Sequence, residues 1–431
     1  MTVADLAPSR APLARFIAAS GLTNLADGVA VVVWAWLASL LTRDPLLVAL
    51  MPVALRLPWF LFALPAGIVT DRVDRRRLIL AMDVARAVAF ALAAAAVWTA
   101  SPLPPPPEGG TAAPALFAAL LVCALGVGTA EVFRDNAAQT MLPALVPHAA
   151  LERANGRLWS VELVGNSLLG PALGAFLIAA VIWLPFALNA AAFALAALLL
   201  TTLRGQFRPE ARATRAWRAE LGEGVGFLRG AALLRLLAVI TGVWNLLHQM
   251  VVIALVLHVQ ENLGLGARAY GLILAAGAAG GILGGLVAER VVRMMGPGRA
   301  AQWMTLASAA AFGAIPLAPN GAALALVLAA FEFTGLIWNT VSVSYRQRTI
   351  PDALLGRVNS VYRLLAWGMM PVGLILSGLI VRGAEGLLPR EAALGAPFVV
   401  AALGAALLTA FAWGPLGRGF RSAAQADGPS L

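Results

Sequence analysis

Several ionisable side chains lie inside long apolar runs of this sequence, among them Asp27, Arg56, Glu162 and Glu332. An ionised side chain at the middle of a bilayer costs about 2.5 to 3.5 kcal/mol on insertion scales, so such groups normally face water or a partner. Desolvation disfavours the charged form of a carboxyl group, which allows it to bind and release a proton near neutral pH. The chemistry that these residues predict is proton transfer, or binding of a charged substrate, inside a membrane.

Helical spacing arranges polar residues into stripes on two of these runs. At 1.5 Å per residue, Asp27 and Glu332 each lie about 18 Å from the start of their run. Residues three or four apart share a helix face, and the two faces hold Asn24, Asp27, Val31 and Trp34, and Glu332, Gly335, Asn339, Ser342 and Arg346. We therefore expect Asp27 and Glu332 to border a solvated cavity. For Asp27, the alternatives are a static ion pair with Arg56 and a packing hydrogen bond.

Other polar and aromatic residues extend this candidate cavity. They are Asn245, His248, Gln249, Asn339, Trp34, Trp244 and Trp338. A hydrogen-bonded structural role is favoured for His248 over a titrating one, although imidazole can titrate near neutral pH. Each tryptophan offers a substrate a flat apolar wall, or packs against helices or lipid.

The apolar runs must be transmembrane helices. The chain has 431 residues, of which 61% are hydrophobic and 12% charged, and about 20 apolar residues suffice to cross a bilayer. We predict an all-α membrane protein with twelve spans in two pseudo-symmetric six-helix bundles. The predicted spans are 14–40, 46–70, 78–100, 114–136, 155–181, 183–203, 232–260, 268–290, 299–318, 320–344, 360–381 and 396–413.

The spans divide the chain into two halves joined by a polar segment. The predicted parts are an N-terminal bundle (1–203), a cytoplasmic linker (204–231), a C-terminal bundle (232–413) and a cytoplasmic tail (414–431). The linker is expected to be partly an amphipathic helix. The Pro- and Gly-rich segment 101–113 is expected to be an extended spacer, because proline cannot continue a helix.

The arginines predict the orientation of the chain. All 31 basic residues are arginine, and most fall in loops on one side of the predicted membrane, while only Arg43, Arg268, Arg382 and Arg390 fall in loops on the other. The positive-inside rule then places both termini in the cytoplasm of a multi-pass protein of the cell membrane. The net charge of +10 therefore indicates topology, and no nucleic-acid partner is expected. No cleavable signal peptide is expected either.

Composition argues against several chemistries. The absence of lysine excludes a P-loop for ATP and a Schiff base. The lone Cys123 and the scattered His148, His248 and His258 form no metal motif, and no G-x-S-x-G is present. We expect no cofactor, no metal and no enzymatic activity, with an intramembrane enzyme as a remote alternative.

Two short charged motifs occur in both halves. Gly67-x-x-x-Asp71-Arg72-x-x-Arg75 matches Gly285-x-x-x-Glu289-Arg290-x-x-Arg293, and Pro147-x-x-x-Leu151-x-Arg153-x-Asn155 matches Pro351-x-x-x-Leu355-x-Arg357-x-Asn359. Repeated halves are the construction of many secondary transporters. The small glycine would let helix ends approach closely, and the charges, with Arg76, would clamp them on the cytoplasmic face. The expected clamp partners are Asp83, Arg86, Glu131 and Asp135, the last two pairing with Arg75 or Arg76; the alternative is that the arginines only anchor topology.

The segment 67-GIVTDRVDRRR-77 resembles motif A of the major facilitator superfamily, and 285-GLVAERVVR-293 resembles its weaker second copy. The likeness covers nearly the whole chain. Asp74, in place of a common glycine, and the segment 143–156 are similar to the branch of siderophore exporters and macrolide efflux proteins. The stretch with Gly165, Gly170, Pro171 and Gly174 resembles motif C of proton-coupled exporters. The resemblance implies that the first, fourth, seventh and tenth helices line a central cavity.

These observations predict a secondary active transporter. We expect proton-coupled efflux of an amphipathic small molecule, such as a drug, macrolide or siderophore, by alternating access. An importer or an uncoupled facilitator is the alternative. The expected partners are the lipid bilayer, the small-molecule substrate and protons, and the protein is expected to be a monomer.

Overall fold

A computed structural model describes residues 11–70, 72–147, 151–203, 205, 207–208 and 217–426. In this part of the chain every regular element is a helix, so the all-α prediction is confirmed. Eleven of the described helices are long and apolar enough to cross a membrane. The helix at the predicted span 299–318, Pro297–Ala314, is not among them, so the count of twelve spans stays a prediction.

The chain divides into two compact units, described separately here. Unit 1 comprises residues 1–42 and 51–213, and unit 2 comprises residues 43–50 and 214–431. The segment 43–50 thus belongs to unit 2 although its neighbours in sequence on both sides belong to unit 1.

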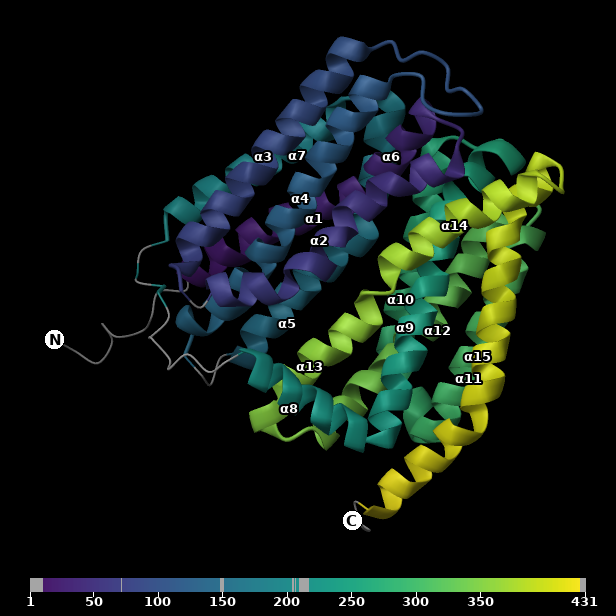
Figure 1. Ribbon diagram of the computed structural model, residues 1–431. Helices are drawn as coiled ribbons and strands as arrows, with labels where there is room; N and C mark the ends of the chain where they lie inside the picture. The colour runs from purple at the N-terminus through teal and green to yellow at the C-terminus, as the bar shows by residue number, and fades with distance from the viewer. Residues whose placement is uncertain are drawn as a thin grey trace. The chain divides into compact units, whose positions relative to one another are not determined.

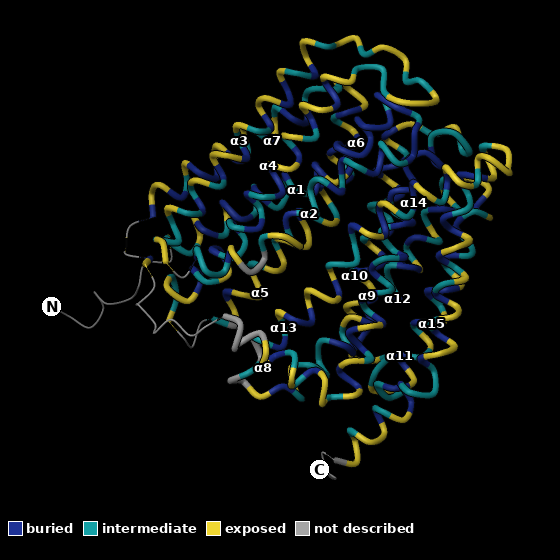
Figure 2. Tube along the Cα trace, viewed as in Figure 1, coloured by how far each residue is buried: buried dark blue, intermediate teal, exposed yellow. Residues whose placement is uncertain are grey.

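Unit 1 contains helices α1 and α3 to α7 and most of α2 (Figure 1). Helix α1 packs against α5, α6 and α7, and α3 packs against α4 and α7. The bounds are α1 Ala11–Leu41, α2 Pro45–Thr70, α3 Arg75–Ala100, α4 Pro114–Met141, α5 Leu151–Glu162, α6 Gly170–Ala180 and α7 Leu184–Thr201. Exposed and buried positions alternate along α3, as expected for a helix with one face in a bundle (Figure 2).

An aromatic cluster fills the centre of unit 1. Trp34 of α1 lies edge-on to Phe186 of α7, with ring centroids 5.0 Å apart, and Phe90 of α3 stacks on Phe193 of α7 at 5.5 Å. Trp34 is only 1% exposed. Of the roles expected for Trp34, a wall for substrate is therefore wrong and packing against helices holds, because its ring is enclosed by the helices of its own unit.

Helix α3 begins at an aspartate that caps it. The Asp74 carboxylate accepts a hydrogen bond from the backbone N–H of Arg77 at 2.9 Å, which satisfies one of the donors left open at a helix start. Its second oxygen accepts from the backbone N–H of Phe207 at 3.3 Å. Asp74, the departure from the common motif A pattern, thus fixes both the start of α3 and the segment after α7.

The fifth predicted span contains a π-helical interruption. Helix α5 is followed by seven residues of π-helix, Leu163–Leu169, and then by α6. The backbone N–H of Gly170 donates to the Gly165 carbonyl five residues back. The next residue, Pro171, has no N–H to donate, so the regular helical ladder cannot continue through this point. Such single-turn π segments occur frequently at functional sites.

Unit 2 contains the remaining helices (Figure 1). Helix α9 packs against α13, α14 and α15, α10 packs against α12, and α11 packs against α12 and α15. The bounds are α8 Trp217–Gly230, α9 Ala232–Leu257, α10 Ala267–Met295, α11 Pro297–Ala314, α12 Gly321–Thr349, α13 Asp352–Trp367, α14 Met370–Glu385 and α15 Arg390–Ala426, with a π segment at His258–Asn262. Helix α15 continues beyond residue 413, where the last span was predicted to end.

Helix α8 lies in the predicted linker and packs on α13. Glu223 of α8 forms an ion pair with Arg357 of α13. A Cβ atom at Gly224 would lie 2.8 Å from the Arg357 carbonyl oxygen, so the two backbones are close. The linker helix α8 therefore packs against α13 at Arg357, in the second copy of the Pro-Leu-Arg-Asn motif.

Glycines bring α10 and α12 into backbone contact. A Cβ atom at Gly280 or Gly284 would overlap the carbonyl oxygen of Ala329 or Phe333, respectively. In contrast, a Cβ atom at Gly285 would meet no described atom within 4 Å. The same holds for Gly67, so the prediction that the motif A glycine and its repeat permit close backbone approach is wrong in this structure. The close approach occurs instead at Gly284, the residue directly before Gly285, and at Gly280, on an adjacent face of α10.

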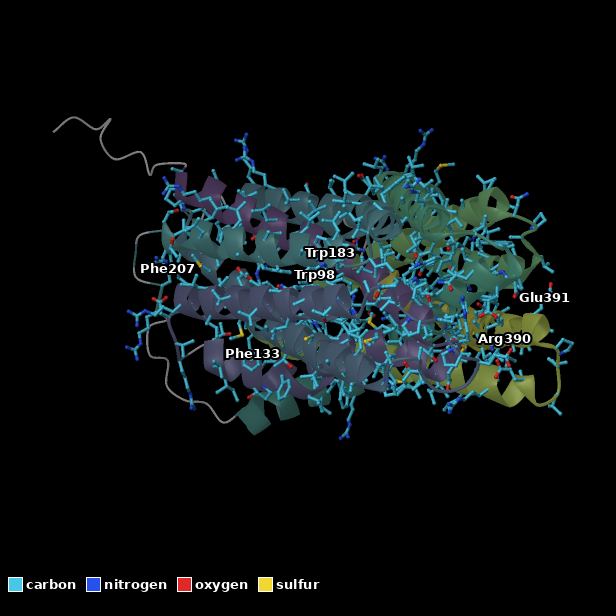
Figure 3. The ribbon with its side chains drawn as sticks, turned by 90° about the horizontal axis from the view of Figure 1, so that it is seen from above. Trp98, Phe133, Trp183, Phe207, Arg390 and Glu391 are labelled. Atoms are coloured by element: carbon cyan, nitrogen blue, oxygen red, sulfur yellow. The ribbon has the colours of Figure 1, made fainter. Side chains whose placement is uncertain are left out.

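Two tryptophans of unit 1 lie near the Pro-rich loop. Figure 3 labels Trp98 and Trp183 close together near the middle of the view, and Phe207 at its left side. Trp98 lies in the last turn of α3 and is 63% exposed. Trp183 lines the same hollow as residues 101–106 of the Pro-rich loop. Exposed tryptophan near a helix end is typical of the boundary between lipid and water.

Three arginines predicted on the outer side join an ionic cluster in unit 2. Arg390, labelled beside Glu391 in Figure 3, binds Glu261 through two nitrogens at 2.6 and 2.9 Å. Arg390 also donates to the backbone carbonyl of Arg43 at 2.7 Å. Arg382 binds the carboxylate of Asp44 through two nitrogens as well. These contacts bind the segment 43–50 to the rest of unit 2.

Replacing Arg390 with Lys should lower the free energy of unfolding by about 1 kcal/mol. Lysine keeps the charge but cannot make the two parallel bonds to Glu261, and the partly exposed setting limits the loss. Thermal unfolding of the purified protein would measure this. Arg268→Lys, at an exposed position that is also predicted to lie on the outer side, is the matched control and should leave stability unchanged. Equal unfolding temperatures for the two variants would contradict the prediction.

Candidate functional site

The charged core of unit 1 begins with an ion pair between α1 and α3. Asp27 pairs with Arg86, whose side chain is fully buried, whereas that of Asp27 remains 18% exposed. The Arg86 guanidinium also lies over the Phe193 ring, 4.0 Å from its centroid. One alternative and one prediction are corrected here. The ion-pair partner of Asp27 is Arg86 instead of Arg56, the partner considered as an alternative, and Arg86 belongs to this deep site rather than to the predicted clamp.

Further charged groups of α2, α3 and α4 continue this array. Asp83 lies 3.5 Å from Arg134, which also contacts Asp135 at 3.3 Å. Arg56 of α2 lies 3.9 Å from Glu131 of α4. The predicted pairing of Glu131 and Asp135 with the motif A arginines is therefore wrong. The orientation of α4 instead turns Glu131 toward Arg56 of α2 and Arg134 toward Asp83 of α3, and Asp135 contacts Arg134 on its own helix.

The array has more acids than bases. We call these residues the unit 1 charge array: Asp27, Asp83, Glu131 and Asp135 with Arg56, Arg86 and Arg134. Four carboxylates and three guanidiniums leave one negative charge when all are ionised. Glu162, exposed at the end of α5, adds a fifth carboxylate within the electrostatic field of Arg134 and Asp135. Binding of one proton would neutralise the core of the array.

The motif C-like segment positions Asp27. A Cβ atom at Gly28 would lie 2.7 Å from the Gly165 carbonyl oxygen, and one at Gly174 would lie 2.8 Å from the Val29 carbonyl oxygen. Gly170, followed by Pro171, also lies against Gly28: a Cβ atom there would be 2.5 Å from the Gly28 Cα atom. The π-helix and α6 therefore cross α1 backbone to backbone at the residue next to Asp27.

A buried hydrogen bond from the side-chain amide of Asn189 joins α7 to α1. Asn189 of α7 is 3% exposed and donates to the Ala26 carbonyl at 2.9 Å. A buried side-chain donor that is satisfied by a helix carbonyl restricts how that helix can slide. Nothing in the sequence pattern singled out Asn189, which lies alone in an apolar run.

Unit 2 contains a separate site with one acid and one imidazole. His248 of α9 lies 3.0 Å from the Glu332 carboxylate of α12, and both side chains are partly exposed. Trp244 stacks on His248 at 4.9 Å and on Phe331 at 5.3 Å. We call Trp244, His248, Phe331 and Glu332 the unit 2 aromatic site. It combines a flat apolar surface with a carboxylate and a titratable partner.

Two other predicted cavity residues have different surroundings. Asn245 is 8% exposed and donates to the Ala366 carbonyl of α13 at 2.9 Å, so it holds two helices together. Asn339 is exposed on α12, one turn beyond the buried Gly335. Asn245 is therefore a packing residue, and Asn339 keeps an accessible amide.

The motif A arginines bind helix ends within unit 1. Arg75 donates to the Thr140 carbonyl at 2.9 Å, and Arg76 donates to the Leu200 and Thr201 carbonyls at 2.9 and 2.6 Å. The last carbonyls of a helix lack partners within the helix, and a cation there also complements the helix dipole. These arginines thus tie α3 to the ends of α4 and α7.

The remaining gate residues are more exposed. Arg72 is exposed, and Asp71 lies outside the described residues. In the second copy, Glu289 and Arg293 pair along α10 at 3.5 Å, with side chains 82% and 72% exposed, and Arg290 is also exposed. The second copy consequently lacks the helix-end contacts of the first within the described part of unit 2.

Comparison with known families identifies the class of protein. The model of the Major Facilitator Superfamily matches residues 16–374. The chain therefore belongs to the Major Facilitator Superfamily, as its motifs predicted, and it is a multi-pass membrane transporter of small molecules rather than an enzyme.

Similar proteins include multidrug pumps and transporters of solved structure. The "Multidrug efflux pump Tap" of Mycolicibacterium fortuitum is 27% identical over 91% of this chain and 94% of its own length. The protein of that name from Mycobacterium tuberculosis (strain ATCC 25618 / H37Rv) is 28% identical over 93% and 94%. A bacterial homologue of the iron transporter ferroportin in the inward-facing state has a TM-score of 0.69 at 15% identity, covering 95% of this chain and 98% of its own. The nucleoside transporter NupG has 0.70 at 13%, covering 94% and 98%.

Proposed function

We propose that this protein is a proton-coupled exporter of amphipathic small molecules in the cell membrane. Two relatives that match nearly its whole length are named multidrug efflux pumps. The motif C-like segment, with its Pro171 and closely packed glycines against α1, favours export over import. Drugs, macrolides and siderophore-like compounds fit this class of substrate.

The observation that carries the proposal is the ion pair between Asp27 and a buried arginine, within an array that has one carboxylate more than it has guanidiniums. Asp27 pairs with Arg86, which is fully buried, and its own partial exposure gives a proton a route to it. Protonation would neutralise Asp27 and weaken the pair, so that α1 and α3 change their preferred packing. A group whose charge state changes the packing of helices can couple proton binding to alternating access.

The driving force is sufficient for such a switch. Moving one charge across 100 mV is worth about 2.3 kcal/mol. That free energy shifts a two-state equilibrium by nearly fifty-fold. One proton per cycle would therefore bias the conformational equilibrium strongly, without any ATP-binding motif in the chain.

The unit 2 aromatic site supplies the features that an amphipathic substrate requires. Trp244, which is partly exposed, stacks on the buried Phe331 ring with centroids 5.3 Å apart. Glu332 lies next to Phe331 in α12 and is 28% exposed in its side chain. A planar apolar group can stack on the indole while the carboxylate binds a cation or, when protonated, donates a hydrogen bond.

The proposal includes an orientation and a domain organisation. Both termini lie in the cytoplasm, as the distribution of arginine predicts. The bundles 1–203 and 232–413 are the two moving halves, 204–231 links them, and 414–431 is a cytoplasmic tail. The protein acts as a monomer in the bilayer.

Replacing Glu332 with Gln should reduce pH-driven efflux of ethidium, a planar cationic dye, by at least about tenfold while the protein remains folded. The amide keeps the size of the side chain and can still bond His248, but it cannot release a proton. Efflux would be followed in proteoliposomes with an imposed pH gradient, and folding by thermal unfolding. Glu108→Gln, in the exposed Pro-rich loop, is the control with the same chemical change.

Three results would contradict parts of this proposal. Undiminished efflux by Glu332→Gln would remove Glu332 from the coupling site. If neither the pH gradient nor a protonophore changes transport by the natural protein, the protein is an uncoupled facilitator. Accumulation of the dye in the direction of the proton flux would indicate an importer.

A further inference from the structure

A groove in unit 2 lies apart from both charged sites. It has a volume of about 720 Å³ and is bordered by the first turns of α9, the end of α12 and the last turns of α15. Its walls include Arg235, Leu236 and Val239 of α9, Tyr345 of α12 and Arg418 of α15. We call it the basic groove. Figure 1 shows the last turns of α15, in yellow, at the same end of unit 2 as α8.

The polar end of the basic groove is positively charged. Arg235 and Arg418 are exposed and come from different helices, and none of the described residues that line the groove is acidic. Arg235 donates to the backbone carbonyl of Arg229, which restricts the orientation of its side chain. Two guanidiniums with no acid among the groove's walls form a site for a phosphate group, which guanidinium binds with strong charge-assisted bonds.

The rest of the basic groove is apolar and extends along a transmembrane helix. Leu236 and Val239 follow Arg235 by one and four residues on α9, so Val239 lies about 6 Å further along the helix axis. Val239 is 52% exposed. A small anion dissolved in water would gain nothing from this apolar wall. A molecule with a phosphate head and a hydrocarbon chain would contact both parts.

We propose that the basic groove binds an anionic phospholipid of the surrounding bilayer. The phosphate lies between Arg235 and Arg418, and one acyl chain runs along Leu236 and Val239. Basic pockets between transmembrane helices on the cytoplasmic side are known to bind lipid head groups of this kind. The lipid would connect α9, α12 and α15 at the end of unit 2. This inference does not depend on what the protein transports.

The test measures lipid retained by the purified full-length protein. The protein is placed in nanodiscs of phosphatidylcholine with a minority of phosphatidylglycerol, and the retained lipids are counted by native mass spectrometry. The natural protein should retain phosphatidylglycerol selectively. The variant Arg235→Gln/Arg418→Gln should bind it about tenfold or more weakly, because each basic residue near the membrane surface contributes to binding.

A second variant tests the apolar half of the site. Val239→Trp keeps both arginines but fills the path of the acyl chain, so it should also lose selective retention. Arg153→Gln/Arg157→Gln removes two exposed arginines of α5 in unit 1 and is the matched charge control. It should bind phosphatidylglycerol as the natural protein does. Circular dichroism and thermal unfolding establish that each variant is folded.

Several outcomes would overturn the proposal. One is equal retention by the natural protein and Arg235→Gln/Arg418→Gln. Another is full retention by Val239→Trp, which would show that no chain occupies the groove. Equal loss in Arg153→Gln/Arg157→Gln would indicate general surface charge. Displacement of the lipid by millimolar inorganic phosphate would indicate a site for an aqueous anion.

Discussion

Replacing Asp27 with Asn should abolish proton-driven efflux and lower the free energy of unfolding by about 3 to 5 kcal/mol. The first effect follows from the loss of the carboxyl group proposed to carry the proton. The second follows from Arg86, whose fully buried guanidinium would lose its partner. Removing one member of a buried ion pair leaves an uncompensated charge and is strongly destabilising. Thermal unfolding in detergent and ethidium efflux in proteoliposomes would measure the two effects.

A double variant separates the functional effect from the structural one. Asp27→Asn/Arg86→Met removes both charges and keeps an apolar side chain against Phe193, and replacing a whole buried pair in this way is often nearly neutral. Its stability should approach that of the natural protein, while pH-driven efflux stays absent. Recovery of efflux in the double variant would show that Asp27 serves only to compensate Arg86. An unchanged unfolding temperature in Asp27→Asn would contradict the buried pair itself.

Replacing Gly280 and Gly284 with Ala should together destabilise unit 2 by about 5 kcal/mol. Each new methyl group would overlap a backbone carbonyl oxygen of α12, so the helices must separate. Overpacking a tight contact costs about 1 to 3 kcal/mol per site and occasionally more. Because α10 carries Gly277 and Gly281 against Glu332, the separation should also disturb the unit 2 aromatic site. Unfolding temperature and the yield of monodisperse protein are the measurements.

The control for this prediction is Gly285→Ala on the same helix. Its Cβ atom would meet no described atom within 4 Å, and alanine has a higher helix propensity than glycine by about 1 kcal/mol. We therefore expect Gly285→Ala to leave stability unchanged or slightly increased. Destabilisation equal to that of the Gly280 and Gly284 changes would restore the close-approach interpretation of the motif A glycine.

The composition and repeats of the sequence were sufficient to predict the class of protein. Apolar runs of membrane length require helices, because backbone groups in lipid must be satisfied within the segment. The duplicated motifs predicted two related halves and the superfamily, which the family model confirms. Because a charge in lipid is costly, the sequence alone indicated Asp27, Arg56 and Glu332 as candidate residues of a functional site.

Which side chains pair with these residues could be determined only from the tertiary structure. A soluble helix shows which face is buried through its apolar stripe, but a membrane helix is apolar toward both lipid and neighbouring helices, so its rotation is not readable from the pattern. For this reason the sequence pattern places Arg86 at a helix end instead of opposite Asp27, and it leaves open whether Trp34 lines a cavity or packs against helices.

The closest glycine contacts of α10 and the partner of His248 could not be predicted from the sequence either. The sequence contains small residues at four-residue intervals on two faces of α10, and only packing against α12 selects Gly280 and Gly284 for the closest contact. His248 and Glu332 are 84 residues apart, and nothing local links them. The sequence by itself determined which groups are costly in a membrane. Helix rotation and packing, which depend on many weak long-range contacts at once, decided which groups compensate them.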